Sequence, residues 1–165
     1  MPERFRRNYT LMIGPALGVV ILDQITKAMI TGALKVHESI PLIQGFFNLV
    51  HVRNRGMAFG LMSRSHADAA FWFLVGASCV AIGLLLFWFF RLKGDDTRMT
   101  PGLSLILGGA IGNLIDRIRF REVVDFLDVF WGPYHWPAFN VADAAITIGT
   151  IWVAITIISR PSSAD

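Results

Sequence analysis

Charged residues are scarce in this chain, and cysteine is almost absent. Asp, Glu, Lys and Arg make up 16% of the 165 residues, against ~25% in an ordinary soluble domain. Hydrophobic residues make up 54%, which leaves too few polar side chains to cover a soluble globule. This composition excludes a disordered chain and a nucleic-acid-binding domain. The single cysteine, Cys79, excludes an internal disulfide scaffold. The net charge of +3 fits the basic loops of a membrane protein.

Four apolar runs have about the length of a membrane-spanning helix, which needs ~20 mostly apolar residues. The clearest run, Ala69–Phe90, has 22 residues and no charge, and Met99–Ile115 has 17 uncharged residues. Two further runs are interrupted only by Asp23 with Lys27 and by Asp143. We therefore expect an all-α integral membrane protein with four transmembrane helices. It would form a single membrane domain over residues 1–165, with spans at about 10–31, 69–90, 99–118 and 138–159.

The first run has a second interpretation, because it begins after Arg4, Arg6 and Arg7 and ends at small residues, as a cleavable signal peptide does. Its charged pair and the three later runs favour a retained helix. Basic residues outside the runs divide seven against seven between the two sides of the membrane. The N-terminal arginines decide between the orientations, because the first helix usually dominates, and place both termini in the cytoplasm.

Two connections are then expected on the outer side of the membrane. Residues 32–68 form a long outer loop, and the segment Phe46–Val52 within it is rich in β-forming residues. This pattern predicts a small extracytoplasmic β-subdomain in the first outer loop. The second connection, Val123–Pro137, carries aromatic residues that suit the interfacial belt: Trp131, Tyr134 and Trp136.

Acidic residues in or beside the spans are functional candidates, because a charge inside hydrocarbon costs ~2.5–3.5 kcal/mol even on the lenient insertion scale. In the expected topology Asp23, Asp116 and Asp143 all lie toward the outer face, and Asp125 comes just before the last span on that side. Asp23 and Lys27 are four residues apart and share a helix face. We interpret them as a mutually neutralising pair rather than as catalytic groups.

Other polar residues group around these acids. Asn113, Asp116 and Arg117 share one helix face, and Asn140, Asp143 and Thr147 share another. Gly108 and Gly112 form a small-xxx-small pair, which indicates close helix packing. Asp128 is expected to be solvated at the interface.

The residues present restrict the chemistry. No GxSxG elbow occurs and no histidine lies in a span, so serine catalysis is disfavoured. The four histidines form no HExxH pattern, so a zinc site is disfavoured. Chemistry by paired carboxyls needs no cofactor, and we expect none. The remaining groups are carboxyls at membrane depth. Two close carboxyls can share one proton and act as base and acid, as in an aspartic protease. A proton-coupled transporter, a structural or assembly protein and a membrane lipid hydrolase remain alternatives.

Four motifs resemble those of one family. They are Asp23-Gln24-Ile25-Thr26-Lys27, Asn54-Arg55-Gly56-Met57-Ala58-Phe59, the stretch from Gly108 through Asn113, Asp116 and Arg117 to Val123-Val124-Asp125-Phe126, and Phe139-Asn140-Val141-Ala142-Asp143. Over nearly its whole length the chain is similar to lipoprotein signal peptidases, the type II bacterial signal peptidases. The third and fourth motifs, in order across a short outer loop, are the most specific.

The resemblance implies a four-helix enzyme of the bacterial inner membrane with its active site toward the periplasmic face. It implies an aspartic endopeptidase that cuts a diacylglyceryl-modified prolipoprotein just before the lipidated cysteine. It further implies contact with membrane lipids and inhibition by globomycin-type antibiotics. A monomer is expected, and the composition already excluded a nucleic-acid partner. The family's catalytic aspartates correspond to Asp125 and Asp143. Substrate-binding or supporting positions correspond to Asn54, Gly56, Asn113, Asp116, Arg117, Asn140, Asp23 and Lys27.

Two residues depart from the family pattern. Met57 stands where the family usually has Ala, which could alter the shape of the pocket. Arg121 stands where Gly is usual, four residues before Asp125, which puts the local backbone turn in doubt, because Gly often marks a positive φ.

Overall fold

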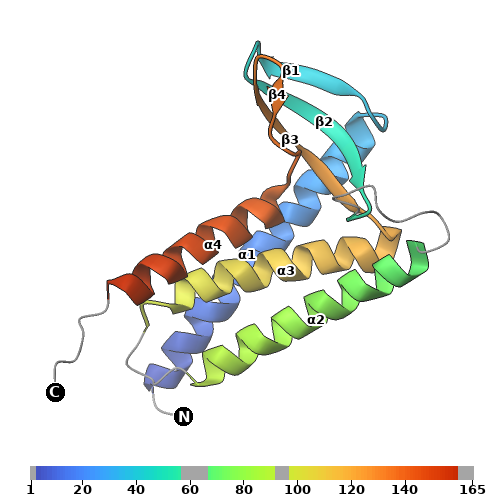
Figure 1. Cartoon of the computed structure of the whole chain (residues 1–165). Helices are drawn as coiled ribbons and strands as arrows, with labels where there is room; N and C mark the ends of the chain where they lie inside the picture. The colour runs from blue at the N-terminus through green and yellow to red at the C-terminus, as the bar shows by residue number, and fades with distance from the viewer. Residues whose placement is uncertain (1–2, 57–66, 92–96, 160–165) are drawn as a thin grey trace.

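The computed structural model describes residues 3–56, 67–91 and 97–159. Four helices form a bundle, and a small antiparallel sheet covers one end of it (Figure 1). The first turn of α1 and the last turn of α4 lie at the end opposite the sheet. The helices are α1 (Glu3–Ala33), α2 (Ala67–Arg91), α3 (Thr100–Phe120) and α4 (Val141–Ile158).

Three of the described helices are long and apolar enough to cross a membrane. The apolar stretches are Thr10–Ala33 of α1, Asp68–Arg91 of α2 and Val141–Ile158 of α4. Large hydrophobic side chains point outward from them, with Ile13 59% and Phe73 73% exposed. Such surfaces suit hydrocarbon as the surrounding solvent. α3 is not among the three, so the expected count of four spans remains a prediction.

α3 is the central helix and packs against α1, α2 and α4. Small residues allow this close approach. A Cβ added to Gly108 would lie 2.6 Å from the backbone oxygen of Ala16 in α1, and one added to Gly112 would lie 2.7 Å from the carboxylate of Asp23. Both distances are too short for a non-bonded contact between a carbon and an oxygen atom. The interpretation of Gly108 and Gly112 as packing residues is therefore confirmed.

The sheet has the order β1-β2-β3-β4 and is antiparallel throughout. Its strands are β1 (Ser39–Ile43), β2 (Phe47–Asn54), β3 (Val123–Trp131) and β4 (Tyr134–His135). Only β1 and β2 come from the first connection, where the sequence predicted the whole subdomain. The central strand β3 and the short β4 come from the second connection. A lone two-stranded hairpin is marginal in water, and β3 supplies the third strand that covers the free edge of β2.

The pairing of β2 with β3 brings together two of the motifs found in the sequence. Val52 pairs with Asp125, and Asn54 pairs with Val123. The first residues of β3, Val123 to Phe126, are buried. The end of β2 therefore lies beside the acid that precedes α4.

Arg121 ends α3 in the left-handed conformation, with φ 60° and ψ 10°. Its N–H donates to the carbonyl of Arg117 at 2.8 Å, which closes the last turn of the helix. The turn that Gly would favour is thus present with an arginine in its place. The second departure, Met57, lies outside the described residues, as do Ala58 and Phe59 of the same motif.

A non-glycine residue in the left-handed region costs roughly 1–2 kcal/mol. We therefore expect Arg121→Gly to have a free energy of unfolding ~1 kcal/mol higher than Arg121→Ala. Both variants lose the same side-chain contacts, so their difference isolates the backbone. Reversible unfolding in detergent measures it. Equal stability of the two variants would show that the backbone at Arg121 is unstrained.

Candidate active site

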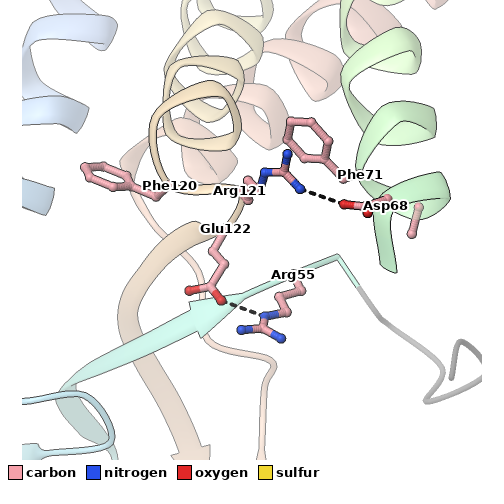
Figure 2. Close-up of a pocket in the computed structure, with 7 residues that line it drawn as sticks. Arg55, Asp68, Phe71, Phe120, Arg121 and Glu122 are labelled. Carbon is pink, nitrogen blue, oxygen red and sulfur yellow. Dashed lines mark hydrogen bonds and ion pairs between the residues drawn. The ribbon is translucent and has the colours of Figure 1, made fainter. Parts of the chain in front are cut away.

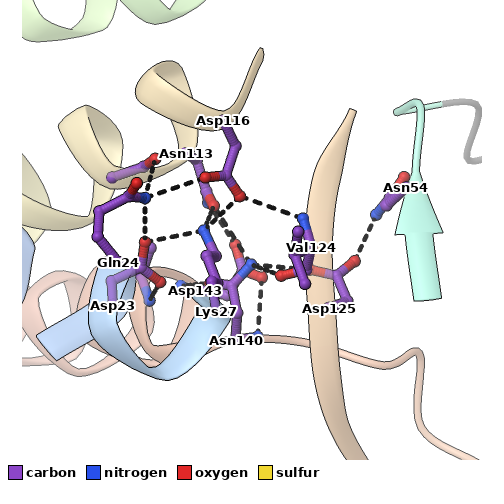
Figure 3. Close-up of polar contacts among 12 residues, drawn as sticks. Asp23, Gln24, Lys27, Asn54, Asn113, Asp116, Val124, Asp125, Asn140 and Asp143 are labelled. Carbon is purple, nitrogen blue, oxygen red and sulfur yellow. Dashed lines mark hydrogen bonds and ion pairs between the residues drawn. The ribbon is translucent and has the colours of Figure 1, made fainter. Parts of the chain in front are cut away.

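A buried ion-pair cluster lies where α1 meets α3, beside the start of β3 (Figure 3). Lys27 Nζ lies 2.8 Å from Asp23 Oδ2 and 2.9 Å from Asp116 Oδ2, and it donates to Asn113 Oδ1 at 3.1 Å. The three charged residues are at most 3% exposed. The neutralising pair expected from the spacing of Asp23 and Lys27 is therefore present, and Asp116 joins it from α3.

The two acids of this cluster also hold the backbone of other elements. Asp23 Oδ1 accepts from the N–H of Ala142, 3.0 Å away at the start of α4. Asp116 Oδ2 accepts from the N–H of Val124, 3.1 Å away at the start of β3. Ala142 immediately precedes Asp143, and Val124 immediately precedes Asp125. Each buried acid therefore fixes the main chain beside one of the two aspartates assigned by resemblance to catalysis.

Gln24 completes the cluster and was not singled out from the sequence. Its side-chain amide donates to Asp116 Oδ1 at 3.0 Å and to Asp23 Oδ2 at 3.2 Å. It satisfies Asp116 Oδ1, which Lys27 does not contact, and shares Asp23 Oδ2 with the lysine. The only sequence signal for Gln24 was its position next to Asp23 in the first motif. Helical periodicity cannot show that its side chain bridges an acid of α1 and an acid of α3.

Asp125 and Asp143 are brought together by one shared residue, Asn140. Its side-chain amide donates to Asp125 Oδ1 at 2.7 Å, and its side-chain oxygen accepts the N–H of Asp143 at 2.9 Å. In return, Asp143 Oδ2 accepts the N–H of Asn140 at 3.3 Å, which completes a capping box at the start of α4. Asn140 is fully buried. The helix cap and the link between the two aspartates are therefore the same side chain.

Two further amides contact the aspartates. Asn54, at the end of β2, donates to Asp125 Oδ2 at 2.9 Å, and Asn113 donates to Asp143 Oδ1 at 2.7 Å. The oxygen of Asn113 faces Lys27, so the lysine charge orients this amide with its N–H₂ group toward Asp143. The oxygen of Asn54 accepts the N–H of Gly56 at 2.7 Å, which likewise directs its donor toward Asp125.

Burial in this site raises the pKa of Asp125 from 3.8 to about 6. Removal from water is the main cause, and the negative charge of Asp143 adds to it. The hydrogen bonds from Asn54 and Asn140 and the charge of Lys27 act in the opposite direction. Asp125 thus holds its proton to a higher pH than an ordinary aspartic acid does, and a neighbouring carboxylate contributes to this.

Gly56 and Arg117, which the sequence also placed in the site, lie at its edge. Gly56 has a φ of +73°, and an added Cβ would meet the side chain of Leu74. Arg117 is half-buried on α3 and interacts electrostatically with Asp143, Asp125 and Asp116. Its side chain forms no hydrogen bond or ion pair with the described residues.

The expectation for Asp128 was wrong. It is 7% exposed rather than solvated. His135 Nδ1 lies 2.8 Å from one of its oxygens, and the Asn48 amide donates to the other at 3.0 Å. The sequence did not predict β3 and β4, and the burial of Asp128 was missed for the same reason. Its partners lie on other strands, Asn48 on β2 and His135 on β4. Asp128 therefore belongs to the sheet and not to the contacts around Asn140.

A cavity of about 400 Å³ opens beside Asp143 on the surface of α4. Its wall is otherwise mostly apolar, formed by Trp136, Phe139, Ala144, Thr147 and Ile148. A carboxyl at the edge of an apolar groove suits a ligand that presents one polar group from an apolar body.

Comparisons with known proteins agree on one family. Residues 15–159 match the family model described as Signal peptidase (SPase) II. The lipoprotein signal peptidase of Nitratidesulfovibrio vulgaris (strain DP4) is 44% identical over 155 residues, 94% of this chain and 93% of its own length. That of Syntrophotalea carbinolica is 51% identical over 143 residues, 86% and 87% of the two chains.

Solved structures give the same result for the fold. Two structures titled as a bacterial membrane enzyme, at 1.9 Å and 2.3 Å resolution, are each 34% identical to this chain. Their TM-scores are 0.79 and 0.80. The first alignment covers 91% of this chain and 94% of the other, and the second covers 93% and 91%. The fold of apolar helices with a small antiparallel sheet is thus that of a membrane enzyme.

The ion-pair cluster predicts a large stability effect at Lys27. Lys27→Met leaves Asp23 and Asp116 buried without their cation, and breaking a buried pair in this way costs roughly 3–5 kcal/mol. We expect that loss in the free energy of unfolding in detergent. Lys35→Met is the matched control, because Lys35 is exposed and surface substitutions usually change stability by less than about 0.5 kcal/mol. Equal stability of the two variants would contradict the structural role of the cluster.

Proposed function

The chain belongs to the signal peptidase II family, and on that premise we propose an aspartic, intramembrane mechanism for its lipoprotein signal peptidase activity. Asp125 and Asp143 are the catalytic pair. The enzyme removes the signal peptide from a diacylglyceryl-modified prolipoprotein by cutting before the lipidated cysteine. No cofactor takes part in this mechanism.

The observation that carries the proposal is the joint contact of Asn140 with Asp125 and Asp143. It donates to the carboxylate of one and caps the backbone N–H of the other, at 2.7 Å and 2.9 Å. Asp125 has a pKa raised to about 6, in part by the charge of Asp143. Two carboxyls of this kind favour a state with one proton between them, which supplies a base and an acid at the same site.

The reaction follows from that shared proton. The ionised carboxyl removes a proton from a water molecule, whose oxygen attacks the carbonyl carbon of the scissile peptide bond. The protonated carboxyl donates its proton to the carbonyl oxygen, which gives a neutral tetrahedral diol. A proton is then passed to the leaving nitrogen as the C–N bond breaks, and the other carboxyl takes the diol proton. The pair ends with one proton, as it began, and titrates as a unit.

The surroundings of the pair suit a lipidated peptide. The apolar cavity beside Asp143 borders the outward-facing surface of α4. The diacylglyceryl chains can stay in the bilayer while the peptide bond reaches the carboxyls. Four residues hold the substrate or the catalytic pair: Asn54, Asn113, Arg117 and Asn140. The ion-pair cluster of Asp23, Lys27 and Asp116 fixes the backbone beside the pair. Gly56 keeps the chain after β2 close to α2.

The arrangement in the membrane forms part of the same proposal. α3 is the fourth spanning helix, because the three apolar helices surround it, and α1 and α4 supply partners for its buried polar residues Ser104, Asn113 and Asp116. Both termini lie in the cytoplasm of the bacterial cell, and the sheet and the catalytic pair lie at the periplasmic face of the inner membrane. The enzyme acts as a monomer, and globomycin-type inhibitors occupy the site.

Replacing either member of the pair tests the proposal. We expect Asp125→Asn and Asp143→Asn each to lower the cleavage rate at least 10²-fold, because general acid–base catalysis contributes roughly 10²–10⁴-fold. The assay is release of the signal peptide from a diacylglyceryl-modified prolipoprotein by the purified protein in detergent. Asp128→Asn is the matched control, since Asp128 is also a buried acid of β3 but pairs with His135. Cleavage that survives Asp125→Asn or Asp143→Asn would overturn the residue assignment.

A further inference from the structure

Two consecutive residues at the junction of α3 and β3 each form an ion pair with a different part of the chain (Figure 2). Arg55 Nε lies 2.6 Å from Glu122 Oε1, and Arg121 Nη1 lies 2.6 Å from Asp68 Oδ1. Arg55 directly follows β2, and Asp68 lies in the first turn of α2. The two pairs surround a cavity of about 310 Å³. Its described lining includes none of the residues that contact Asp125 or Asp143.

Aromatic rings and guanidinium groups together form the walls of this cavity. The guanidinium carbon of Arg121 lies 4.9 Å from the ring centre of Phe71. Two further arginines lie outside the lining but next to it: the guanidinium carbons of Arg53 and Arg119 are 5.3 Å and 4.9 Å from the ring centre of Phe120. A guanidinium stacked on a ring keeps its in-plane N–H groups available, and their fork matches the oxygens of a phosphate.

The ion pairs leave donors unused. In the lining the charges of Arg55 and Arg121 are balanced by those of Glu122 and Asp68. Arg53 and Arg119, which are not part of the lining, add two positive charges beside it at the ring of Phe120. Arg55 contacts Glu122 through Nε, which leaves its two terminal nitrogens without a partner among the described residues. The side chains of Arg55 and Arg121 are each 63% exposed. The cavity is therefore suited to an anion.

The opposite wall of the cavity continues into an apolar helix surface. Ala70 and Phe71 line the cavity from the beginning of α2. The next residues, Trp72 and Phe73, are 65% and 73% exposed, and no charge follows before Arg91. A ligand that fills the cavity and continues along α2 must be anionic at one end and apolar at the other. A phospholipid has this construction, whereas a free phosphate does not.

We propose that this cavity binds the headgroup phosphate of an anionic phospholipid, with Arg55 and Arg121 as its ligands and the acyl chains along α2. Arginine side chains recognise phosphate groups through paired N–H donors in this way. In the proposed orientation the sheet end of the bundle is periplasmic, where the positive-inside rule does not favour arginines, and a phosphate ligand gives a reason for them to gather there. The cavity is separate from the peptidase site and does not depend on the proposed mechanism.

Fluorescence of Trp72 tests the proposal directly. Four of the five tryptophans are replaced by Phe, which leaves Trp72, and the protein is placed in nanodiscs with brominated phosphatidylglycerol or brominated phosphatidylcholine. Quenching at a series of mole fractions gives the relative association constant of the two lipids. We expect a preference for phosphatidylglycerol. Arg55→Gln and Arg121→Gln should each lower that preference about fivefold, which corresponds to ~1 kcal/mol per arginine near an anionic surface.

Arg91→Gln is the matched control. Arg91 also lies on α2 and stacks on an aromatic ring, 5.3 Å from that of Phe87, but at the opposite end of the helix. Its substitution should leave the preference at Trp72 unchanged. Should a variant fail to fold, the wild-type preference must still weaken as salt is raised. Equal quenching by the two lipids in the wild type, an equal effect of the control, or abolition of the preference by millimolar inorganic phosphate would overturn the proposal.

Discussion

The ion pairs of Lys27 with Asp23 and Asp116 are the interaction on which the rest of the structure depends. Three charges in the core of a membrane bundle are costly unless they neutralise one another and find hydrogen bonds. Both acids meet this need partly with backbone N–H groups, at Ala142 and Val124. The requirement to satisfy buried charge therefore joins α1 and α3 to the start of α4 and of β3. The same contacts set the positions of the two catalytic candidates, Asp143 and Asp125.

Close packing makes this cluster possible. Gly112 faces the carboxylate of Asp23, where a Cβ would lie 2.7 Å from its oxygen. Any larger residue would separate α1 from α3 and leave Lys27 without its second partner. The sheet adds a second constraint, because the pairing of β2 with β3 places Asn54 within hydrogen-bond distance of Asp125. Helix packing and strand pairing thus position residues of the same small site.

The sequence predicted the features that depend on local pattern. Charge-free runs indicated the helices, and acids at membrane depth, together with family motifs, indicated Asp125 and Asp143. Features that depend on distant partners were missed. β3 and β4 form because β2 has a free edge, which no periodicity within Val123–Trp131 reveals. The burial of Asp128 and the bridge made by Gln24 likewise need residues from other elements. The family motifs indicated that Asn140 holds the substrate or the pair, but its contacts with both aspartates form only when α4 and β3 are in place.

The central claim is that Asp125 and Asp143 share one proton. The carboxyl ¹³C resonances of aspartate-labelled protein in nanodiscs, followed across a pH titration, measure this directly. Asp125 should titrate near its raised pKa of about 6. In Asp143→Asn the midpoint should move to lower pH, because the charge of Asp143 is one cause of the raised pKa. A midpoint near 4 for Asp125, or one that Asp143→Asn leaves in place, would contradict a proton shared by the two carboxyls.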